Sequence, residues 1–138
     1  MILVPEGGLP KEKRQAHEPA EKDIRRTLDD AERMVKAAFI VAAFAAAWGA
    51  LEAAMRRRVR AAGREAGWRT MSRTMLNELY SSGELSTSVL RDLERLFQVR
   101  SAVVHGFSAP EVEPGAVRFL VDTARRLLTQ SQPAKQPA

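Results

Sequence analysis

Cysteine is absent from this chain, and histidine occurs only twice. The lack of Cys excludes a disulfide scaffold and thiolate chemistry, and with so few His it also excludes a structural zinc site built from Cys and His. Aromatic residues are scarce, at 6%, which argues against a β-rich fold. The composition therefore predicts a helical protein with no structural zinc site.

Long, strongly hydrophobic runs are also missing. The longest uncharged stretch, residues 37–51, has fifteen residues, of which nine are Ala or Gly. A membrane-spanning helix needs about 20 strongly apolar residues, and the apolar start of the chain, residues 1–4, is too short for a signal peptide. We therefore expect 37–51 to lie in a core helix, in a soluble cytoplasmic protein.

Alanine and arginine are abundant instead. Ala occupies 22 of the 138 positions and Arg 17, and the net charge is +5. Both residue types favour helices. The Arg excess has two explanations that composition cannot separate: the base composition of the genome, or a polyanionic partner. A hydrophobic content of 45% is enough for the core of one domain of this length.

Composition divides the chain into a flexible arm over residues 1–17, a helical domain over 18–130 and a disordered tail over 131–138. Apolar periodicity predicts an all-α, up-and-down bundle of four to five helices. The predicted helices cover about 19–35, 38–62, 72–81, 87–105 and 114–130. A break near 36–39 and one continuous helix through it are both allowed. Ser86 is the expected N-cap of the fourth helix, and Gly106 follows its end.

Two charges fall on apolar faces of these helices. On a helical wheel Arg100 lies about 20° from Leu93, in the apolar stripe of helix 87–105. Glu52 lies about 40° from Trp48, on the apolar face of helix 38–62. An unpaired buried charge is costly, so we predict an ion pair between Glu52 and Arg100. The pair could serve only to fix helix register, or it could also orient Arg100 for function.

His105 ends the same helix as Arg100, five residues later and about 140° around the wheel. A helix C-terminus stabilises a cationic imidazole, which suits a general acid near neutral pH. The alternative is that His105 only caps the helix by bonding its last carbonyls. Position alone leaves both roles open.

Two segments resemble a known family. LFQVRSAVVHG at 96–106 resembles the signature of HEPN-domain proteins, an Arg followed after four to six residues by His at the end of a bundle helix. AWGALEAA at 47–54 resembles the Trp-x-x-Leu-Glu pattern on the preceding long helix of many members. The similarity extends over about residues 19–129.

The resemblance implies an HEPN-like two-fold dimer and a metal-independent endoribonuclease with no cofactor, serving as a toxin, in phage defence or in RNA processing. Arg100 and His105 would be catalytic in a composite site, with Glu52 and Ser101 supporting them. A partner antitoxin or defence protein is possible, although Phe107 stands where one toxin group carries a modifiable Tyr. The alternative is a non-catalytic module for dimerisation or nucleotide binding.

A basic segment supports an RNA partner. Residues 56–73 contain seven Arg and one Glu, a local charge of +6. Arg56, Arg60 and Arg64 recur every four residues on one helix face, and such a ridge could contact RNA phosphates without reading sequence. The competing interpretation is a solvated helix end whose cations lie near its C-terminus.

Overall fold

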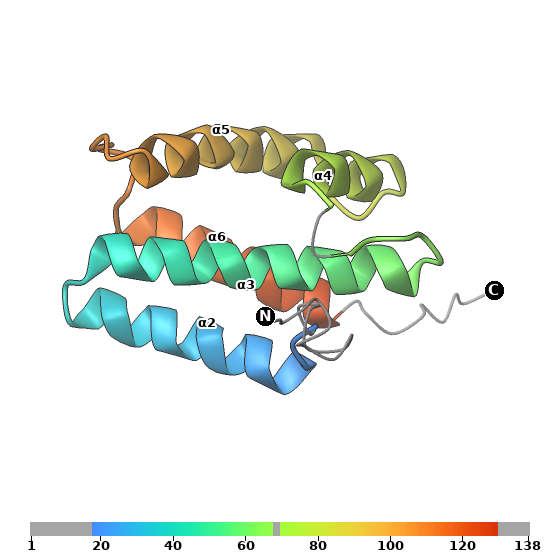
Figure 1. Ribbon diagram of the computed structural model, residues 1–138, viewed down its shortest axis with the longest axis horizontal. Helices are drawn as coiled ribbons and strands as arrows, with labels where there is room; N and C mark the ends of the chain where they lie inside the picture. Colours follow the sequence, from blue (N-terminus) through green and yellow to red (C-terminus); the bar gives the residue numbers. More distant parts are fainter. Residues whose placement is uncertain (1–17, 68–69, 130–138) are drawn as a thin grey trace, which may run out of the picture.

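The computed structural model of the chain describes residues 18–67 and 70–129, so the expected arm over 1–17 and tail over 131–138 lie outside the described residues. Within the described ranges the chain forms five helices and no strand, which confirms the all-α class (Figure 1). The helices are α2 (Glu21–Lys36), α3 (Ile40–Ala61), α4 (Ser72–Ser81), α5 (Thr87–Val104) and α6 (Pro114–Thr129).

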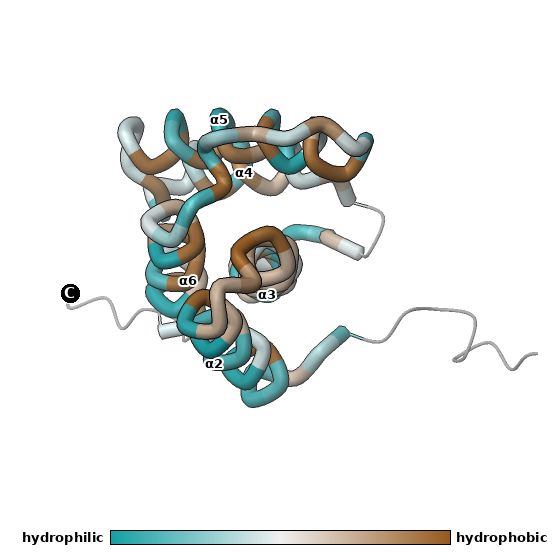
Figure 2. Tube along the Cα trace, turned by 90° about the vertical axis from the view of Figure 1, so that its left-hand side faces the viewer, coloured by the Kyte–Doolittle hydropathy of each residue, from teal (hydrophilic) through white to brown (hydrophobic). Residues whose placement is uncertain are grey.

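The four long helices alternate in direction, as an up-and-down bundle requires, and the short α4 lies between α3 and α5 (Figure 1). α3 packs against α2 and α6 along most of its length, and α2 also contacts α6. α5 has its main backbone contacts with α4 rather than with α3 or α6. The bundle therefore consists of a close three-helix group, with α4 and α5 forming a second layer beside it (Figure 2).

Local sequence signals account for the helix ends. The Ser86 side chain accepts a hydrogen bond of 3.2 Å from the Val89 amide, which confirms the predicted N-cap of α5. Gly63, Gly83 and Gly106 follow three helix ends with φ of 86°, 84° and 89°. Glycine adopts this left-handed conformation without steric cost, so each one ends its helix cleanly.

The structure resolves the alternative over residues 36–39 in favour of a break. Ala38 has a φ of 70°, and the Phe39 amide donates a 2.8 Å hydrogen bond to the Met34 carbonyl. This is the geometry of a glycine-type helix end built on an alanine, which costs about 1–2 kcal/mol in local backbone strain. The turn lets α2 and α3 pack antiparallel.

The uncharged run forms the first half of α3 and supplies much of the core. Phe44, Ala47, Trp48 and Leu51 are each at most 1% exposed. The run is not buried all round, however, because a stripe on its other side is exposed: Val41, Ala42, Ala45 and Gly49. In the part of the chain that the structure describes, no helix combines the length and apolarity needed to cross a bilayer.

A buried ion pair fixes the far end of α3. The Arg58 Nε and Nη2 donate to the two carboxylate oxygens of Glu84 at 3.0 and 2.9 Å, and the side chains are only 11% and 18% exposed. This two-pronged contact ties α3 to the connection between α4 and α5. It therefore helps to orient the second layer on the first.

We expect Glu84→Ala to lower the free energy of unfolding by about 3 kcal/mol, because it leaves the Arg58 guanidinium buried without its partner. Glu78→Ala is the matched control. It breaks the more exposed contact with Arg64 and should cost less than about 1 kcal/mol. Urea denaturation of both variants measures the difference, and equal losses would contradict a structural role for the buried pair.

Candidate functional site

Arg100 lies near the C-terminal end of α5, half-buried as its place on the wheel suggested. The predicted ion pair with Glu52 is wrong: among the described residues no carboxylate pairs with Arg100. Glu52 lies beyond the centre of the buried face of α3, which is offset on the wheel from Trp48. Arg100 lies between Leu93 and Leu96 on the wheel, but it is near the end of α5, and both charged residues are only half-buried.

Glu52 instead anchors α4. Its carboxylate accepts a hydrogen bond from the hydroxyl of Ser72, the first residue of α4, which is only 6% exposed. The N-cap of this helix, Met71, provides no side-chain hydrogen bond. A carboxylate at a helix N-terminus is also stabilised by the helix dipole. Glu52 thus holds the first turn of α4 against α3.

A chain of side-chain contacts then leads from α4 to α5 and back to α3. The guanidinium carbon of Arg73 lies 5.5 Å from the centroid of the Phe97 ring. The Phe97 ring lies 6.0 Å from that of Trp48, tilted by 40°, and Trp48 precedes Glu52 by one turn of α3. These contacts link α3, α4 and α5 to one another. Phe97, which takes part in two of them, precedes Arg100 by one turn of α5.

His105 is the C-cap residue of α5. Its Nδ1 lies 2.8 Å from the backbone carbonyl oxygen of Ser101. A carbonyl oxygen can only accept, so in this contact Nδ1 carries the proton. The ring is thereby held to the helix end while Nε2 remains available on an exposed side chain. The geometry fits a helix cap and equally fits an oriented acid or base.

One side of α3 is covered by no described helix (Figure 2), and apolar residues are exposed both on α3 and at the end of α5. Figure 2 shows α2 and α6 on one side of α3 and α4 and α5 above it, with the remaining side of α3 uncovered by any described helix. Val41 on α3 is 56% exposed, and Val104 and Phe107 at the end of α5 are 64% and 68% exposed. We call this surface, from the exposed stripe of α3 to the C-terminal half of α5, the open face.

The predicted basic ridge is largely neutralised. Arg60 pairs with Glu18 at 2.8 Å, and Arg64 pairs with Glu78. Arg56 donates from Nε to a backbone carbonyl in the loop after α3 at 3.0 Å, so its charge has no carboxylate partner among the described residues. The sequence predicts the row of arginines, but it does not show that Glu18 and Glu78, which lie outside α3, pair with two of them. Of the three arginines of the ridge, Arg56 alone has no carboxylate partner among the described residues and so keeps the free charge that phosphate binding requires.

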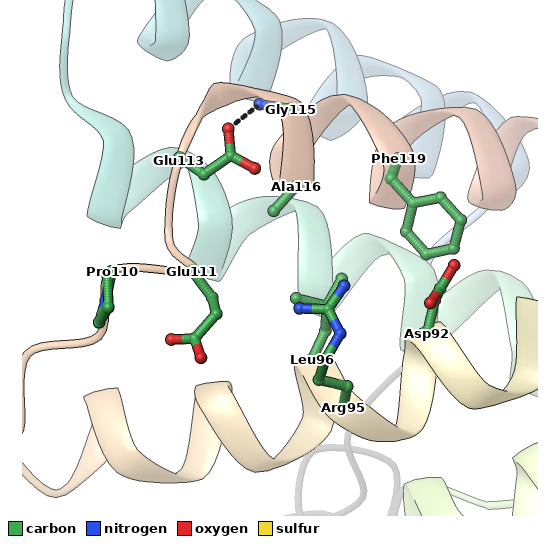
Figure 3. A pocket seen from close by; sticks show the side chains of 9 residues that line it. All are labelled: Asp92, Arg95, Leu96, Pro110, Glu111, Glu113, Gly115, Ala116 and Phe119. Carbon is green, nitrogen blue, oxygen red and sulfur yellow. Dashed lines mark hydrogen bonds between the residues drawn. The ribbon is translucent and has the colours of Figure 1, made fainter.

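A pocket lies elsewhere, between α5 and α6 (Figure 3). It has a volume of about 490 Å³ and includes none of the predicted site residues. Its lining combines one cation with three carboxylates over an apolar floor: Asp92, Arg95, Leu96, Pro110, Glu111, Glu113, Gly115, Ala116 and Phe119. Within residues 18–67 and 70–129 no three or more His, Asp or Glu gather as a metal site would need.

Sequence reasoning missed two arginines. On a helical wheel of α3, Arg58 lies between Ala54 and Leu51, about 40° from the first and about 20° from the second, so its place on the core face could be predicted from the sequence. Arg73 gave no such signal, because it is the second residue of a short helix and its partner ring belongs to α5. Only the tertiary structure brings those two groups together.

No family model, curated protein or solved structure matches the chain. The assignment of function therefore depends on the geometry of its own residues and on the resemblance of the two short motifs.

A double-mutant cycle tests the role found for Glu52. Glu52→Ala and Ser72→Ala should each lower the free energy of unfolding by about 1–2 kcal/mol, since each leaves a partly buried polar group unpaired. The two losses should be non-additive by at least about 0.5 kcal/mol, because the residues share one hydrogen bond. Combining Glu52→Ala with Arg100→Ala should give additive losses. Coupling of Glu52 to Arg100 rather than to Ser72 would contradict the assignment.

Proposed function

We propose that the chain is a metal-independent endoribonuclease of the HEPN type, in which Arg100 and His105 cleave RNA at a composite site of a two-fold dimer. One observation carries the proposal most strongly. An imidazole oriented through Nδ1, with Nε2 available, ends the helix on which Arg100 lies without a carboxylate partner among the described residues. In the cell, such an enzyme would act in the cytoplasm as a toxin, in defence or in RNA processing, with a protein partner that controls it.

The chemistry needs only groups that RNA and these side chains supply. His105 Nε2 takes the proton of the 2′-hydroxyl, or a protonated His105 gives one to the leaving 5′-oxygen. The 2′-oxygen forms a bond to phosphorus as the bond to the 5′-oxygen breaks. Arg100 donates its planar fork of N–H groups to the phosphoryl oxygens as charge develops. The products are a 2′,3′-cyclic phosphate and a 5′-hydroxyl.

Supporting roles follow from the contacts of the neighbouring residues. Ser101 acts on His105 through its backbone carbonyl, which fixes the ring orientation. Its hydroxyl is half-buried beside Arg100 and can donate to a phosphate. Glu52 supports the site indirectly, because its carboxylate bonds to Ser72 of α4 and not to Arg100. Neither residue needs to touch the reacting atoms for the mechanism to operate.

Dimerisation on the open face would complete the site. Arg100 and His105 are separated by about 140° on α5, so a single copy does not present them side by side on an ideal helix. The exposed stripe of α3 contains Ala45 and Gly49, and nothing lies within 4 Å of a Cβ added at Gly49. Small residues allow close approach of another helix, and the apolar surface around them would be covered by the association.

The second candidate is a non-catalytic module for dimerisation or nucleotide binding. The hydrogen bond from His105 to the Ser101 carbonyl favours it, since a side-chain donor to one of the last carbonyls of α5, which also accepts from the His105 amide at 3.2 Å, is what a helix cap provides. In this reading His105 contributes to stability alone. The two candidates therefore differ in what the loss of the imidazole does to RNA cleavage.

Replacement of His105 by Ala separates the two candidates. If the imidazole is an acid or base, His105→Ala should fold and associate as wild type does and cleave single-stranded RNA roughly 10²-fold more slowly. If it is only a cap, the variant should lose about 1 kcal/mol of stability with cleavage intact. The measurement is the cleavage rate in EDTA for both proteins side by side. Equal rates, or no cleavage by either on a broad panel of RNAs, count against the nuclease.

Ala45→Glu tests the dimer. A carboxylate in the centre of the α3 stripe would have to be desolvated in the interface, so the variant should be monomeric at micromolar concentration and inactive on RNA. Asn77→Glu adds the same charge at an exposed position of α4 and should leave the dimer intact. Light scattering with parallel cleavage assays measures both. A fully active wild-type monomer would contradict the composite site.

A further inference from the structure

Arg73 is placed differently from the other arginines around the end of α3. Its guanidinium lies over the Phe97 ring, with 5.5 Å between the guanidinium carbon and the ring centroid. Arg58, Arg60 and Arg64 each pair with a carboxylate, whereas no carboxylate pairs with Arg73 among the described residues. An aromatic face orients a guanidinium without cancelling its charge. Arg73 therefore presents a full positive charge in a defined place.

The support beneath Arg73 is rigid. The Phe97 ring packs on Trp48, which is 1% exposed and so belongs to the core. The side chain of the preceding residue, Ser72, is hydrogen-bonded to Glu52 of α3, and this contact fixes the backbone at Arg73 relative to α3. Both ends of the side chain are thus held, which lowers the conformational entropy lost when a ligand binds.

Arg100 lies on the same face of α5 as Phe97. Residues three apart on a helix are neighbours, with about 5–6 Å between their Cβ atoms. The ring that orients Arg73 is therefore one turn from Arg100, which also has no carboxylate partner among the described residues. Arg73 thus lies over this half-buried ring, and Arg100 follows the ring by one helical turn.

We infer that Arg73 and Arg100 form a phosphate-binding subsite for single-stranded RNA, in which Arg73, held over Phe97, binds the backbone phosphate next to the one that is cleaved. The inference rests on the proposed function, because it assigns how that substrate is held. Guanidinium groups bind phosphate oxygens through two parallel N–H donors. A contact of this kind gives affinity and register without reading sequence.

The test is binding of an RNA that cannot be cleaved. A fluorescent single strand of about twelve nucleotides, 2′-O-methylated throughout so that it lacks the nucleophile, is titrated with full-length protein at several salt concentrations. Arg73→Gln should weaken binding about fivefold and reduce the salt dependence by about 0.7 in the slope of log K against log salt, as for one lost phosphate contact. Arg118→Gln, which removes an exposed guanidinium from α6, should change neither.

Two further variants show whether the ring matters. Arg73→Lys keeps the charge but loses the planar stacking group, so its affinity should lie between those of wild type and Arg73→Gln. Phe97→Leu keeps an apolar side chain and removes the ring face, so it should weaken RNA binding toward the level of Arg73→Gln. The midpoint of thermal unfolding of each variant identifies any loss that comes from a damaged fold.

The possible outcomes separate this inference from the proposed function. Weaker binding by Arg73→Gln supports the subsite, even if the wild type leaves unmodified RNA uncut and the nuclease is thereby contradicted. Cleavage by wild type combined with unchanged binding by Arg73→Gln overturns the subsite alone. A wild-type protein that does not bind the methylated strand at low salt overturns it as well.

Discussion

The contact between Trp48 and Phe97 joins the two layers of the bundle. α2, α3 and α6 pack on one another directly, whereas α5 has its main backbone contacts with α4. α5 is therefore joined to the core by side chains: its buried residues Leu93 and Leu96, and Phe97, whose ring centroid lies 6.0 Å from that of Trp48. A tilted aromatic pair of this kind contributes about 0.5–1.5 kcal/mol beyond the area it buries. The orientation of α5, and with it the placement of Arg100 and His105, depends on this contact and on the buried pair of Arg58 with Glu84.

Some polar residues around that contact stabilise the fold, and others keep their charges for binding a ligand. Glu52 is used within the fold, because its carboxylate secures the first turn of α4. Arg73 and Arg100 keep their charges, since no described carboxylate pairs with them, and Val104, one turn after Arg100 on α5, is 64% exposed. Exposed apolar surface marks interaction sites, and cations without partners attract anionic ligands. This division is the physical basis for placing function on the open face.

Much of the fold could be predicted from the sequence because local rules determine it. Ser72 and Ser81 bound α4 as expected, Ser86 caps α5, and Gly106 ends it. The site was harder, since periodicity tells which residues share a face but not how much of that face the neighbouring helices cover. Alanine adds to this difficulty, because it occurs both in cores and on surfaces. In the alanine-rich α3 the buried face was therefore placed too close to Glu52, and Arg100 was predicted as its partner. Arg73 could not be found at all, since its partner ring comes from another helix. The roles of Arg100 and His105 stay predictions that chemistry must test.

The central claim is that this face cleaves RNA through the substrate's own 2′-hydroxyl. The most direct test is to incubate the full-length protein with an RNA and a DNA of the same sequence and to determine the chemical ends of the products. The account predicts that RNA alone is cut, leaving 2′,3′-cyclic phosphate and 5′-hydroxyl ends. Cleavage of the DNA as well, or RNA products that carry 5′-phosphates, would contradict it, because neither result can arise from attack by a 2′-hydroxyl.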